Sequence, residues 1–217
     1  MQIGRPPRFV PPPSLFLRER LDNFEEFARR DERLYDPLVD AFIMHYQFEA
    51  IHPFEDGNGR VGRLLLSLMI TKWCGLSNQW LYMSEYFDTD KEEYMDRLLR
   101  VSTHNDWQGW IYFCLEGVIK QSLNTEERCN RLLRLSASFK ERVKALQGST
   151  RLQNIVEDLF VTPVVRPTSL ASRYRVRYNT ARSDIDKLVS ADILRELPQA
   201  PQKSYYAPEI VAIIYGN

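Results

Sequence analysis

The chain has 217 residues, of which 44% are hydrophobic, and its 29 basic residues balance 29 acidic ones. That share of apolar residues is enough to bury a core, so the composition excludes a disordered chain. A net charge of zero also argues against a protein that binds polyanions over its whole surface, although it leaves room for a local basic patch.

The three cysteines, Cys74, Cys114 and Cys129, include no Cys-x-x-Cys pair. We therefore expect neither a zinc site nor a disulfide framework, and we expect reduced thiols. The N-terminus lacks the apolar run of a signal peptide, and the most apolar stretch, Val61–Ile70, is about half as long as a membrane span. These features predict a cytoplasmic protein without a membrane partner.

The first predicted element is extended, because five of the twelve prolines fall between Gly4 and Ser14. Such a segment excludes a helix and predicts a hairpin arm or a polyproline II loop. Apolar residues then recur every three or four residues, which is the period of helices. Helices are expected over 14–30, 38–51, 61–73, 91–101, 107–119 and, after the capping-box sequence Asn124–Glu127, over 124–146. His45, on the very apolar second helix, is interpreted as a hydrogen-bonded core residue.

The pattern changes after Gly148. Shorter helices are predicted over 152–160, 169–174 and 179–191, followed by a hairpin of 193–197 and 204–207. Three short helices and a hairpin form the element order of a winged helix-turn-helix. The sequence thus predicts a mainly α protein, with a helical domain over 1–148 and a small α+β winged-helix domain over 149–217.

Several arginines of the predicted winged helix have no acidic residue between the first and the last of them, namely Arg166, Arg173, Arg175, Arg177 and Arg182. Such a cluster could contact DNA phosphates. Asp184 and Asp186 would repel those phosphates from the same predicted helix. Winged helices also serve in dimerisation or protein docking, so the sequence leaves these uses open.

One segment between the two most apolar helices carries the chemistry. It reads His-Pro-Phe-Glu-Asp-Gly-Asn-Gly-Arg-Val-Gly-Arg over residues 52–63. Gly57 and Gly59 permit a sharp turn and a close approach of the backbone to a ligand. The helix that follows directs its unpaired N–H groups and its positive dipole end into the same loop, which makes an anion site.

The side chains of this segment complete a reaction site. Arg60 and Arg63 are phosphate donors one helical turn apart, and Asp56 is a hard oxygen ligand suited to Mg²⁺. The imidazole of His52 takes a proton near neutral pH. A structural turn would explain the glycines, but it does not need a base, a carboxylate and two arginines together. The segment therefore predicts phosphoryl or nucleotidyl transfer.

The same residues match, at every defined position, the motif His-x-Phe-x-Asp/Glu-Gly-Asn-Gly-Arg-x-x-Arg, so the chain resembles Fic-domain proteins over about residues 1–120. The resemblance implies a Fic-type helical bundle with a short β-hairpin flap, here Phe9–Pro13. It implies a protein adenylyltransferase, which transfers AMP from Mg-ATP to a Tyr, Thr or Ser hydroxyl of a target protein and releases pyrophosphate. Kinase relatives carry Lys in place of Gly59, so this glycine favours AMP transfer.

The resemblance also implies a role for each matching residue. His52 would be the general base, Phe54 would anchor the loop in the core, and Asp56 would hold Mg²⁺. The nucleotide-binding residues would be Gly57, Asn58, Gly59, Arg60, Arg63 and, beside the adenine, Tyr94. The flap residues that pair with the target's backbone would be Arg8, Phe9 and Val10.

Two departures from the family pattern bear on partners. The inhibitory signature Ser/Thr-x-x-x-Glu-Gly/Asn, whose Glu would pair with Arg63, has no match, and Tyr112–Gly117 comes nearest. The chain also begins at the flap. We expect either that a shortened chain has lost its inhibitory helix or that a partner protein restrains it in trans. A homodimer stays open as well, and the alternative function is a nucleotide-sensing regulator that binds DNA through the winged helix.

Overall fold

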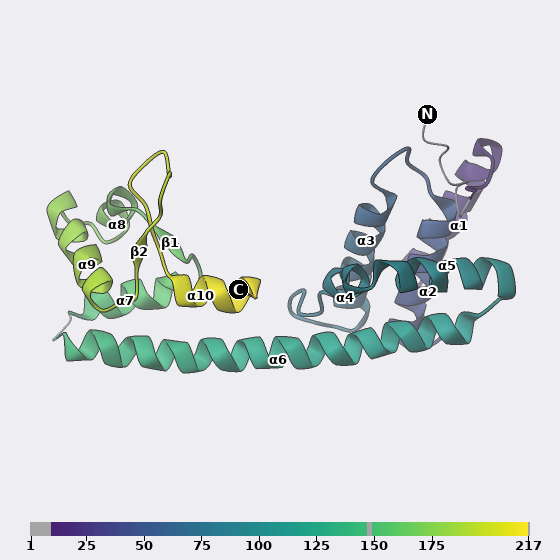
Figure 1. Ribbon diagram of the computed structural model, residues 1–217. Helices are drawn as coiled ribbons and strands as arrows, with labels where there is room; N and C mark the ends of the chain where they lie inside the picture. Colours follow the sequence, from purple (N-terminus) through teal and green to yellow (C-terminus); the bar gives the residue numbers. More distant parts are fainter. Residues whose placement is uncertain (1–9, 147–148, 217) are drawn as a thin grey trace, which may run out of the picture. The chain divides into compact units, whose positions relative to one another are not determined.

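The computed structural model describes residues 10–146 and 149–216 (Figure 1). The chain divides into two compact units, of which unit 1 extends to Thr125 and unit 2 begins at Glu126. This division falls inside a helix, whereas the domain boundary expected from the sequence lies near Gly148. The difference arises because the last turns of that helix, with Leu135 and Phe139, belong to the core of unit 2.

Unit 1 is helical. After a 3-10 turn over Ser14–Phe16, its helices are α1 (Leu17–Arg29), α2 (Pro37–Ile51), α3 (Asn58–Trp73), α4 (Met83–Thr89), α5 (Lys91–His104) and the first part of α6 (Trp107–Ala145). The helices expected over 14–30, 38–51, 61–73 and 91–101 are confirmed. The short α4 has no counterpart among the sequence-based expectations.

Helix α6 corrects one expectation, because a single helix replaces the two predicted over 107–119 and 124–146. The residues of the supposed capping box lie inside the helix instead of starting one. The Thr125 hydroxyl donates to the backbone carbonyl of Trp80 at 3.2 Å, outside α6. Asn124, Glu126 and Glu127 are exposed, and polar residues on a solvent-facing side do not interrupt a helix.

The core of unit 1 is aromatic. Phe42, Phe87 and Trp110 are fully buried, and the Trp110 indole N–H donates to the Phe42 carbonyl at 3.1 Å. His45 is also fully buried, and its Nε2 lies 2.9 Å from the Tyr94 hydroxyl. The interpretation of His45 as a hydrogen-bonded core residue is therefore confirmed.

Helices α2 and α3 approach closely because position 62 has no side chain. A Cβ on Gly62 would lie 3.1 Å from the ring of Phe48 and 2.2 Å from Oε1 of Glu49, both on α2. The second distance is too short for any real Cβ, so only glycine fits without a shift of the carboxylate. This contact fixes the two helix ends between which the motif loop runs.

Unit 2 combines helices with a small sheet. Its helices after α6 are α7 (Thr150–Leu159), α8 (Pro167–Arg173), α9 (Tyr178–Ser190) and α10 (Pro208–Tyr215), and its strands are β1 (Val164–Val165), β2 (Arg195–Glu196) and β3 (Tyr205–Tyr206). Both outer strands pair antiparallel with β3, in the order β1-β3-β2. The helices expected over 152–160, 169–174 and 179–191 are confirmed, and α10 was not expected.

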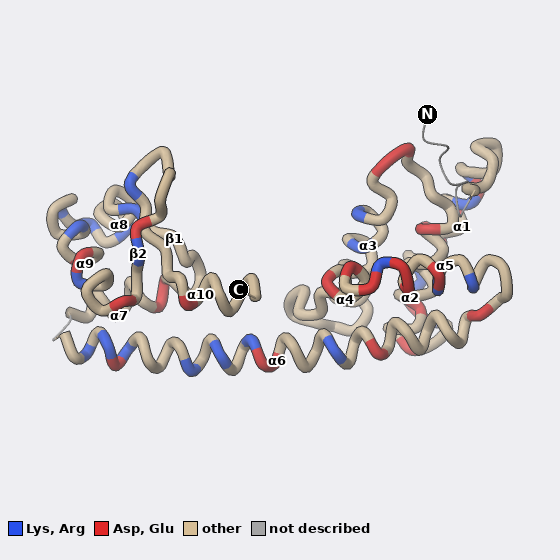
Figure 2. Tube along the Cα trace, viewed as in Figure 1, with Lys and Arg blue, Asp and Glu red and all other residues tan. Residues whose placement is uncertain are grey.

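The chain is mainly helical, as the sequence predicts. Acidic and basic residues both occur along α6 (Figure 2), and the whole chain carries equal numbers of the two. Within the described ranges, no helix combines the length and the apolar character that crossing a membrane requires.

Candidate functional site

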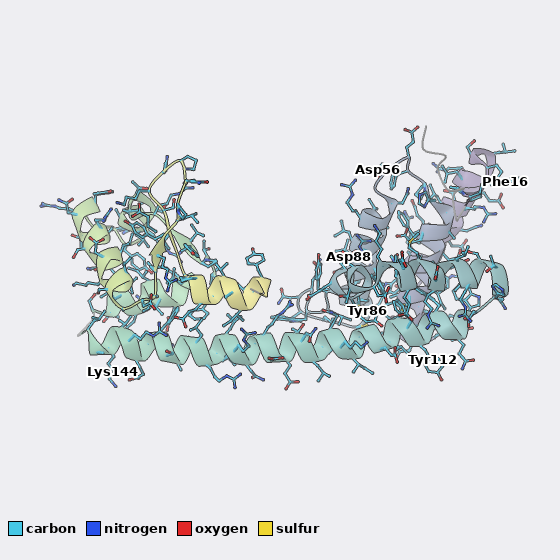
Figure 3. The ribbon with its side chains drawn as sticks, viewed as in Figure 1. Phe16, Asp56, Tyr86, Asp88, Tyr112 and Lys144 are labelled. Carbon is cyan, nitrogen blue, oxygen red and sulfur yellow. The ribbon has the colours of Figure 1, made fainter. Side chains whose placement is uncertain are left out.

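The motif loop, residues 52–57, joins α2 to α3, and Asp56 lies at its far end (Figure 3). His52 ends α2 in the left-handed region, with φ 51° and ψ 58°. That conformation is typical of glycine or asparagine at a helix end, and it is unusual for a residue before proline. Such backbone strain at a titratable residue is a common mark of functional sites.

The imidazole of His52 contacts the backbone of its own helix. Its Nδ1 lies 3.3 Å from the backbone carbonyl oxygen of Glu49. A carbonyl only accepts hydrogen bonds, so Nδ1 carries the proton and donates it. In a neutral imidazole the other nitrogen, Nε2, then holds the lone pair that takes up a proton.

Asn58 closes the loop. Its side-chain oxygen accepts from the backbone N–H of Phe54 at 2.8 Å, and its side-chain N–H donates to the Phe54 carbonyl at 2.6 Å. Asn58 is 3% exposed, whereas the Phe54 side chain is 49% exposed. The expectation that Phe54 anchors the loop in the core is therefore wrong. The buried amide of Asn58 does so, because its two hydrogen bonds fix the loop without a buried ring.

The start of α3 supplies backbone donors. Gly57, with φ 87°, precedes the helix, and no side chain caps the first N–H groups. A positive φ of this size suits glycine. The uncapped N–H groups of residues 58–60 and the helix dipole together favour an anion in the loop.

The two motif arginines differ in their surroundings. Arg60 pairs with Asp56 at 3.1 Å, and both side chains are largely exposed, so this ion pair is weak and easily exchanged. The Arg63 side chain is only 20% exposed and lies 3.9 Å from Asp88 of α4. Arg63 is therefore the better fixed of the two cations.

Asp56 fits the ligand chemistry of Mg²⁺. Its carboxylate is 93% exposed at the loop, where an ion carrying phosphates could reach it. Magnesium usually takes one or two protein carboxylates and fills its remaining positions with water and phosphate oxygens. Among the described residues, no three His, Cys, Asp or Glu side chains gather as a closed metal site. The residues present therefore suit an ion that arrives with a nucleotide.

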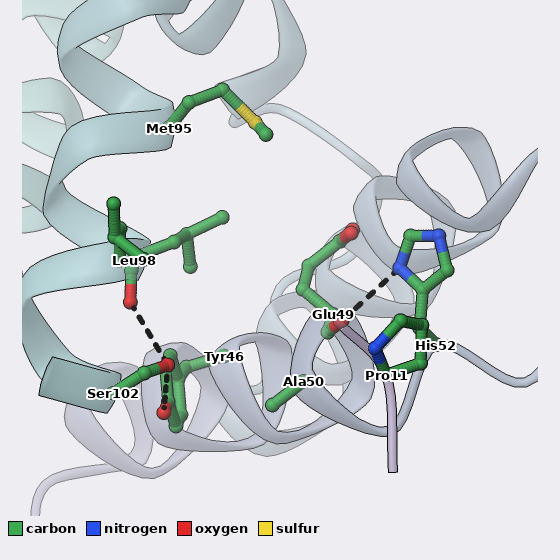
Figure 4. A pocket seen from close by; sticks show the side chains of 9 residues that line it. Pro11, Tyr46, Glu49, Ala50, His52, Met95, Leu98 and Ser102 are labelled. Carbon is green, nitrogen blue, oxygen red and sulfur yellow. Dashed lines mark hydrogen bonds between the residues drawn. The ribbon is translucent and has the colours of Figure 1, made fainter. Parts of the chain in front are cut away.

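A pocket of about 310 Å³ opens beside His52 (Figure 4). Its walls are mostly apolar and come from α2 and α5, with a contribution from the N-terminal segment. The lining residues are Pro11, Tyr46, Glu49, Ala50, His52, Met95, Leu98, Leu99 and Ser102. The Tyr46 hydroxyl lies 2.8 Å from the Ser102 hydroxyl, so this polar pair is already satisfied. The pocket suits a flat apolar group next to the histidine.

Tyr94 does not line this pocket. It is 4% exposed, and its ring stacks on Phe87 with centroids 4.6 Å apart. Burial raises the pKa of its hydroxyl well above the usual value. Tyr94 therefore belongs to the core of unit 1, and its place beside the adenine stays a prediction. The neighbouring Met95 and Leu98 face the pocket instead, because a helix turns by about 100° per residue and only one side of α5 faces His52.

The site also contains a residue that sequence analysis did not single out. Glu49 lines the pocket one turn before His52, and burial raises the pKa of its carboxyl to about 7, against a smaller opposing effect of Arg63. The available signal was a carboxylate on a helix that is otherwise apolar on nearly every side. Asp88 was also missed, because its approach to Arg63 depends on α4.

The predicted flap lies mostly outside the described residues. Arg8 and Phe9 lie outside the described residues, and Val10 is 75% exposed.

In unit 2, the arginines predicted to contact DNA differ in their surroundings. Arg173 pairs with Asp158 at 2.5 Å and Arg182 with Asp186 at 3.1 Å, whereas Arg175 and Arg177 are exposed.

Comparison with family profiles finds a match in the N-terminal third of the chain. Residues 5–70 match the profile of the Fic/DOC family. Over 65 residues, the chain is 38% identical to a probable protein adenylyltransferase of Aquifex aeolicus, which covers 30% of this chain and 20% of that protein. It is also 38% identical over 66 residues to the protein adenylyltransferase fic-1 of Caenorhabditis elegans, covering 30% and 13% of the two chains.

A solved structure of a Fic family protein from Desulfovibrio desulfuricans G20 aligns with 91% of this chain and 56% of its own, at 21% identity and a TM-score of 0.47. The curated relatives are much longer than the part that matches, since the chain spans a fifth or less of their length. The family match contains the whole motif loop and most of α3, whereas α4 to α10 lie outside it.

Proposed function

We propose that this chain is a Fic-type protein adenylyltransferase, which transfers AMP from Mg-ATP to the hydroxyl of a Tyr, Thr or Ser residue of a target protein. Two findings support this proposal: the Fic/DOC match over the motif loop, and relatives that are named protein adenylyltransferases. The observation that carries it is the position of His52, whose Nδ1 contacts the Glu49 carbonyl and whose ring lies in the same loop as the uncapped start of α3.

In the proposed reaction, the target hydroxyl loses its proton to Nε2 of His52, and its oxygen forms a bond to the α-phosphorus. The bond from that phosphorus to the bridging oxygen breaks, and pyrophosphate leaves. The N–H groups of residues 58–60 and the guanidinium groups of Arg60 and Arg63 would hold the phosphates. Asp56 would exchange Arg60 for the Mg²⁺ that the nucleotide brings.

The adenine would lie in the apolar pocket beside His52. Met95 and Leu98 offer it an apolar wall. The docking of the target on Arg8, Phe9 and Val10 stays part of the proposal, as does restraint by an inhibitory helix in cis or in trans. A homodimer and a cytoplasmic location also stay expectations.

Unit 2 is proposed to be a winged-helix module over about 149–217. The order of its elements supports this proposal: α7, β1, α8 and α9 are followed by the paired strands β2 and β3. The acidic partners of Arg173 and Arg182 weaken the alternative function, a DNA-binding regulator, because phosphates would have to displace them. The same ion pairs do not weigh against the other use of a winged helix, which is docking to a protein.

The experiment is label transfer to the proteins of a bacterial lysate from Mg-ATP labelled at the α- or the γ-phosphate. His52→Ala is the test variant, and His104→Ala, which changes an exposed histidine of α5, is the matched control. We expect transfer from the α-label only, a loss of at least about a hundredfold in His52→Ala, and no loss in His104→Ala. Transfer of the γ-label alone would make this a kinase, and equal transfer by His52→Ala would contradict its role as the base.

A further inference from the structure

Unit 2 contains a pocket of about 370 Å³ that the proposed function does not use. It is lined by residues from the end of α7, from the turn that follows, from β1 and from α8 (Figure 1). Its volume falls in the range of pockets that bind small molecules. Three of its described lining residues are apolar and five are polar, and two of the polar residues are arginines.

The buried side of this pocket is apolar. Val165 and Leu170 are 9% and 4% exposed, and both belong to the core of unit 2. Val164, which also lines the pocket, is exposed. An aliphatic group that enters the pocket would leave water and pack against these side chains, which is favourable.

The first arginine, Arg166, is held by a buried hydroxyl. Its Nε donates to Oγ of Ser204 at 3.3 Å, and Ser204 is 2% exposed. The Ser204 hydroxyl in turn donates to the Gln202 carbonyl at 2.8 Å. The two terminal nitrogens of Arg166 have no hydrogen-bond or ion-pair partner among residues 10–146 and 149–216. The bond at Nε therefore positions the guanidinium and leaves its terminal N–H groups for a ligand.

The second arginine, Arg173, is held by a carboxylate. Its Nη2 lies 2.5 Å from Oδ1 of Asp158, and the Tyr174 hydroxyl donates to Oδ2 of the same group. Burial, followed by this hydrogen bond, raises the pKa of Tyr174 to about 12, so the phenol keeps its proton. Both oxygens of Asp158 are thus engaged, while Arg173 retains further N–H donors.

The charge of the lining indicates which anion the pocket suits. Two arginines and one aspartate leave a net charge of +1 on the described lining residues. A carboxylate carries one negative charge, and its two oxygens match the planar donors of a guanidinium. A phosphate monoester carries a charge of about −1.5 to −2 and would keep an excess of negative charge beside Asp158. Thr162 and Ser169 line the same pocket with hydroxyl groups, which can donate to either anion.

We propose that this pocket binds a carboxylate on an aliphatic stem, in which the carboxylate pairs with Arg166 and Arg173 and the stem packs against Val165 and Leu170. Two sources share this chemistry: a small carboxylic acid, and the free C-terminus of a peptide that ends in an aliphatic residue. The site gives unit 2 a ligand of its own, and it does not depend on whether unit 1 transfers AMP.

The test is calorimetric titration of the whole chain with N-acetyl-leucine and with its uncharged amide. We expect the amide to bind at least about tenfold more weakly, because it cannot form the charge-assisted hydrogen bonds. Arg166→Gln should weaken the acid by a similar factor at an unchanged melting temperature. The control Arg134→Gln, an exposed arginine of α6, should behave as the wild type. Equal affinities of the acid and the amide would overturn the inference, and this comparison needs no variant.

The peptide acetyl-Ala-Ala-Leu with a free C-terminus distinguishes the two sources. Tighter binding of the peptide than of N-acetyl-leucine would identify a chain terminus, and equal binding would identify a small acid. The inference is overturned if neither acid binds at about 10 mM, which is weaker than almost any specific site. It is also overturned if inorganic phosphate binds more tightly than N-acetyl-leucine, or if Arg166→Gln abolishes binding of a DNA duplex and leaves the affinity for the acid unchanged.

Discussion

The two units of the chain differ in how many of their buried polar atoms lack a hydrogen-bond partner. Within the described ranges, unit 1 has such atoms on Arg33, Asp40, His45 and Glu49, and unit 2 has one on Tyr205. In unit 2, Arg151 binds the buried Asp184 through two hydrogen bonds. The cores differ as well, since aromatic rings fill the first and mostly aliphatic side chains the second.

This difference concerns stability. A buried carboxylate without a full set of partners lowers stability, and such groups are common at functional sites. A paired arginine on a well-packed core, such as Arg151, contributes stability. We therefore make three predictions about stability, each of which concerns one of the two units.

The largest expected effect concerns the aromatic core of unit 1. Phe87 is fully buried, and its ring stacks on Tyr94 and on His45. Phe87→Ala leaves a large cavity and should lower the free energy of unfolding of unit 1 by about 4 kcal/mol. The four tryptophans, Trp73, Trp80, Trp107 and Trp110, all belong to unit 1, so urea unfolding followed by tryptophan fluorescence measures this unit.

The matched control is Leu188→Ala in the core of unit 2, where Leu188 is fully buried. It should cost a similar free energy in that unit, measured by hydrogen exchange of α7 and α9, and should leave the fluorescence transition unchanged. If Leu188→Ala shifts both signals equally, the two units unfold together and the comparison fails.

The second prediction concerns pH and Glu49. Its pKa is raised from 4.5 to about 7, so the folded chain holds this proton more tightly than the unfolded chain does. Stability therefore falls as the pH rises from about 4.5 to 7 and stays lower above it. Glu49→Gln should be more stable than the wild type by about 3 kcal/mol at pH 8, with no gain near pH 4, measured by the same fluorescence transition.

His45 provides the internal check on this sign. Burial lowers its pKa from 6.5 to about 4, so the folded chain keeps it neutral where the unfolded chain is charged. Its contribution is lost as the pH falls from 6.5 to 4, opposite to that of Glu49. Glu49→Gln should therefore lose stability on acidification more steeply than the wild type, and parallel curves would contradict both assignments.

The smallest effects are expected among the ion pairs of unit 2. Arg151 lies 2.6 Å from Asp184, whose side chain is 3% exposed, so Arg151→Gln strands a buried carboxylate and should cost about 2 kcal/mol. Arg195 and Asp192 are both more than half exposed, and Arg195→Gln should cost less than about 0.5 kcal/mol. Thermal unfolding followed by circular dichroism compares the two variants. Equal losses of stability would show that the burial of an ion pair does not determine its contribution.

Local signals explain which parts of the fold were predictable. Asp36 and Pro37 start α2 as a cap and a first-turn proline, and apolar periodicity marks α1, α3 and α5. The capping box at Asn124–Glu127 predicted a helix start wrongly, because these residues lie inside α6 and a capping box acts only where a helix begins. The short α4 and α10 lack a long enough periodic stretch to be recognised.

The sequence by itself determined the composition of the candidate site, because residues 52–63 are contiguous and the loop and helix that they form are local. Only the tertiary structure decided which distant side chains complete it. The Glu49 carboxylate lies against the start of α3 because Gly62 has no side chain there. Met95, rather than Tyr94, reaches the pocket because the packing of α5 turns one side of that helix inward. Periodicity shows that a helix has an inner side, but the neighbouring helices determine which side chains that side presents to the site.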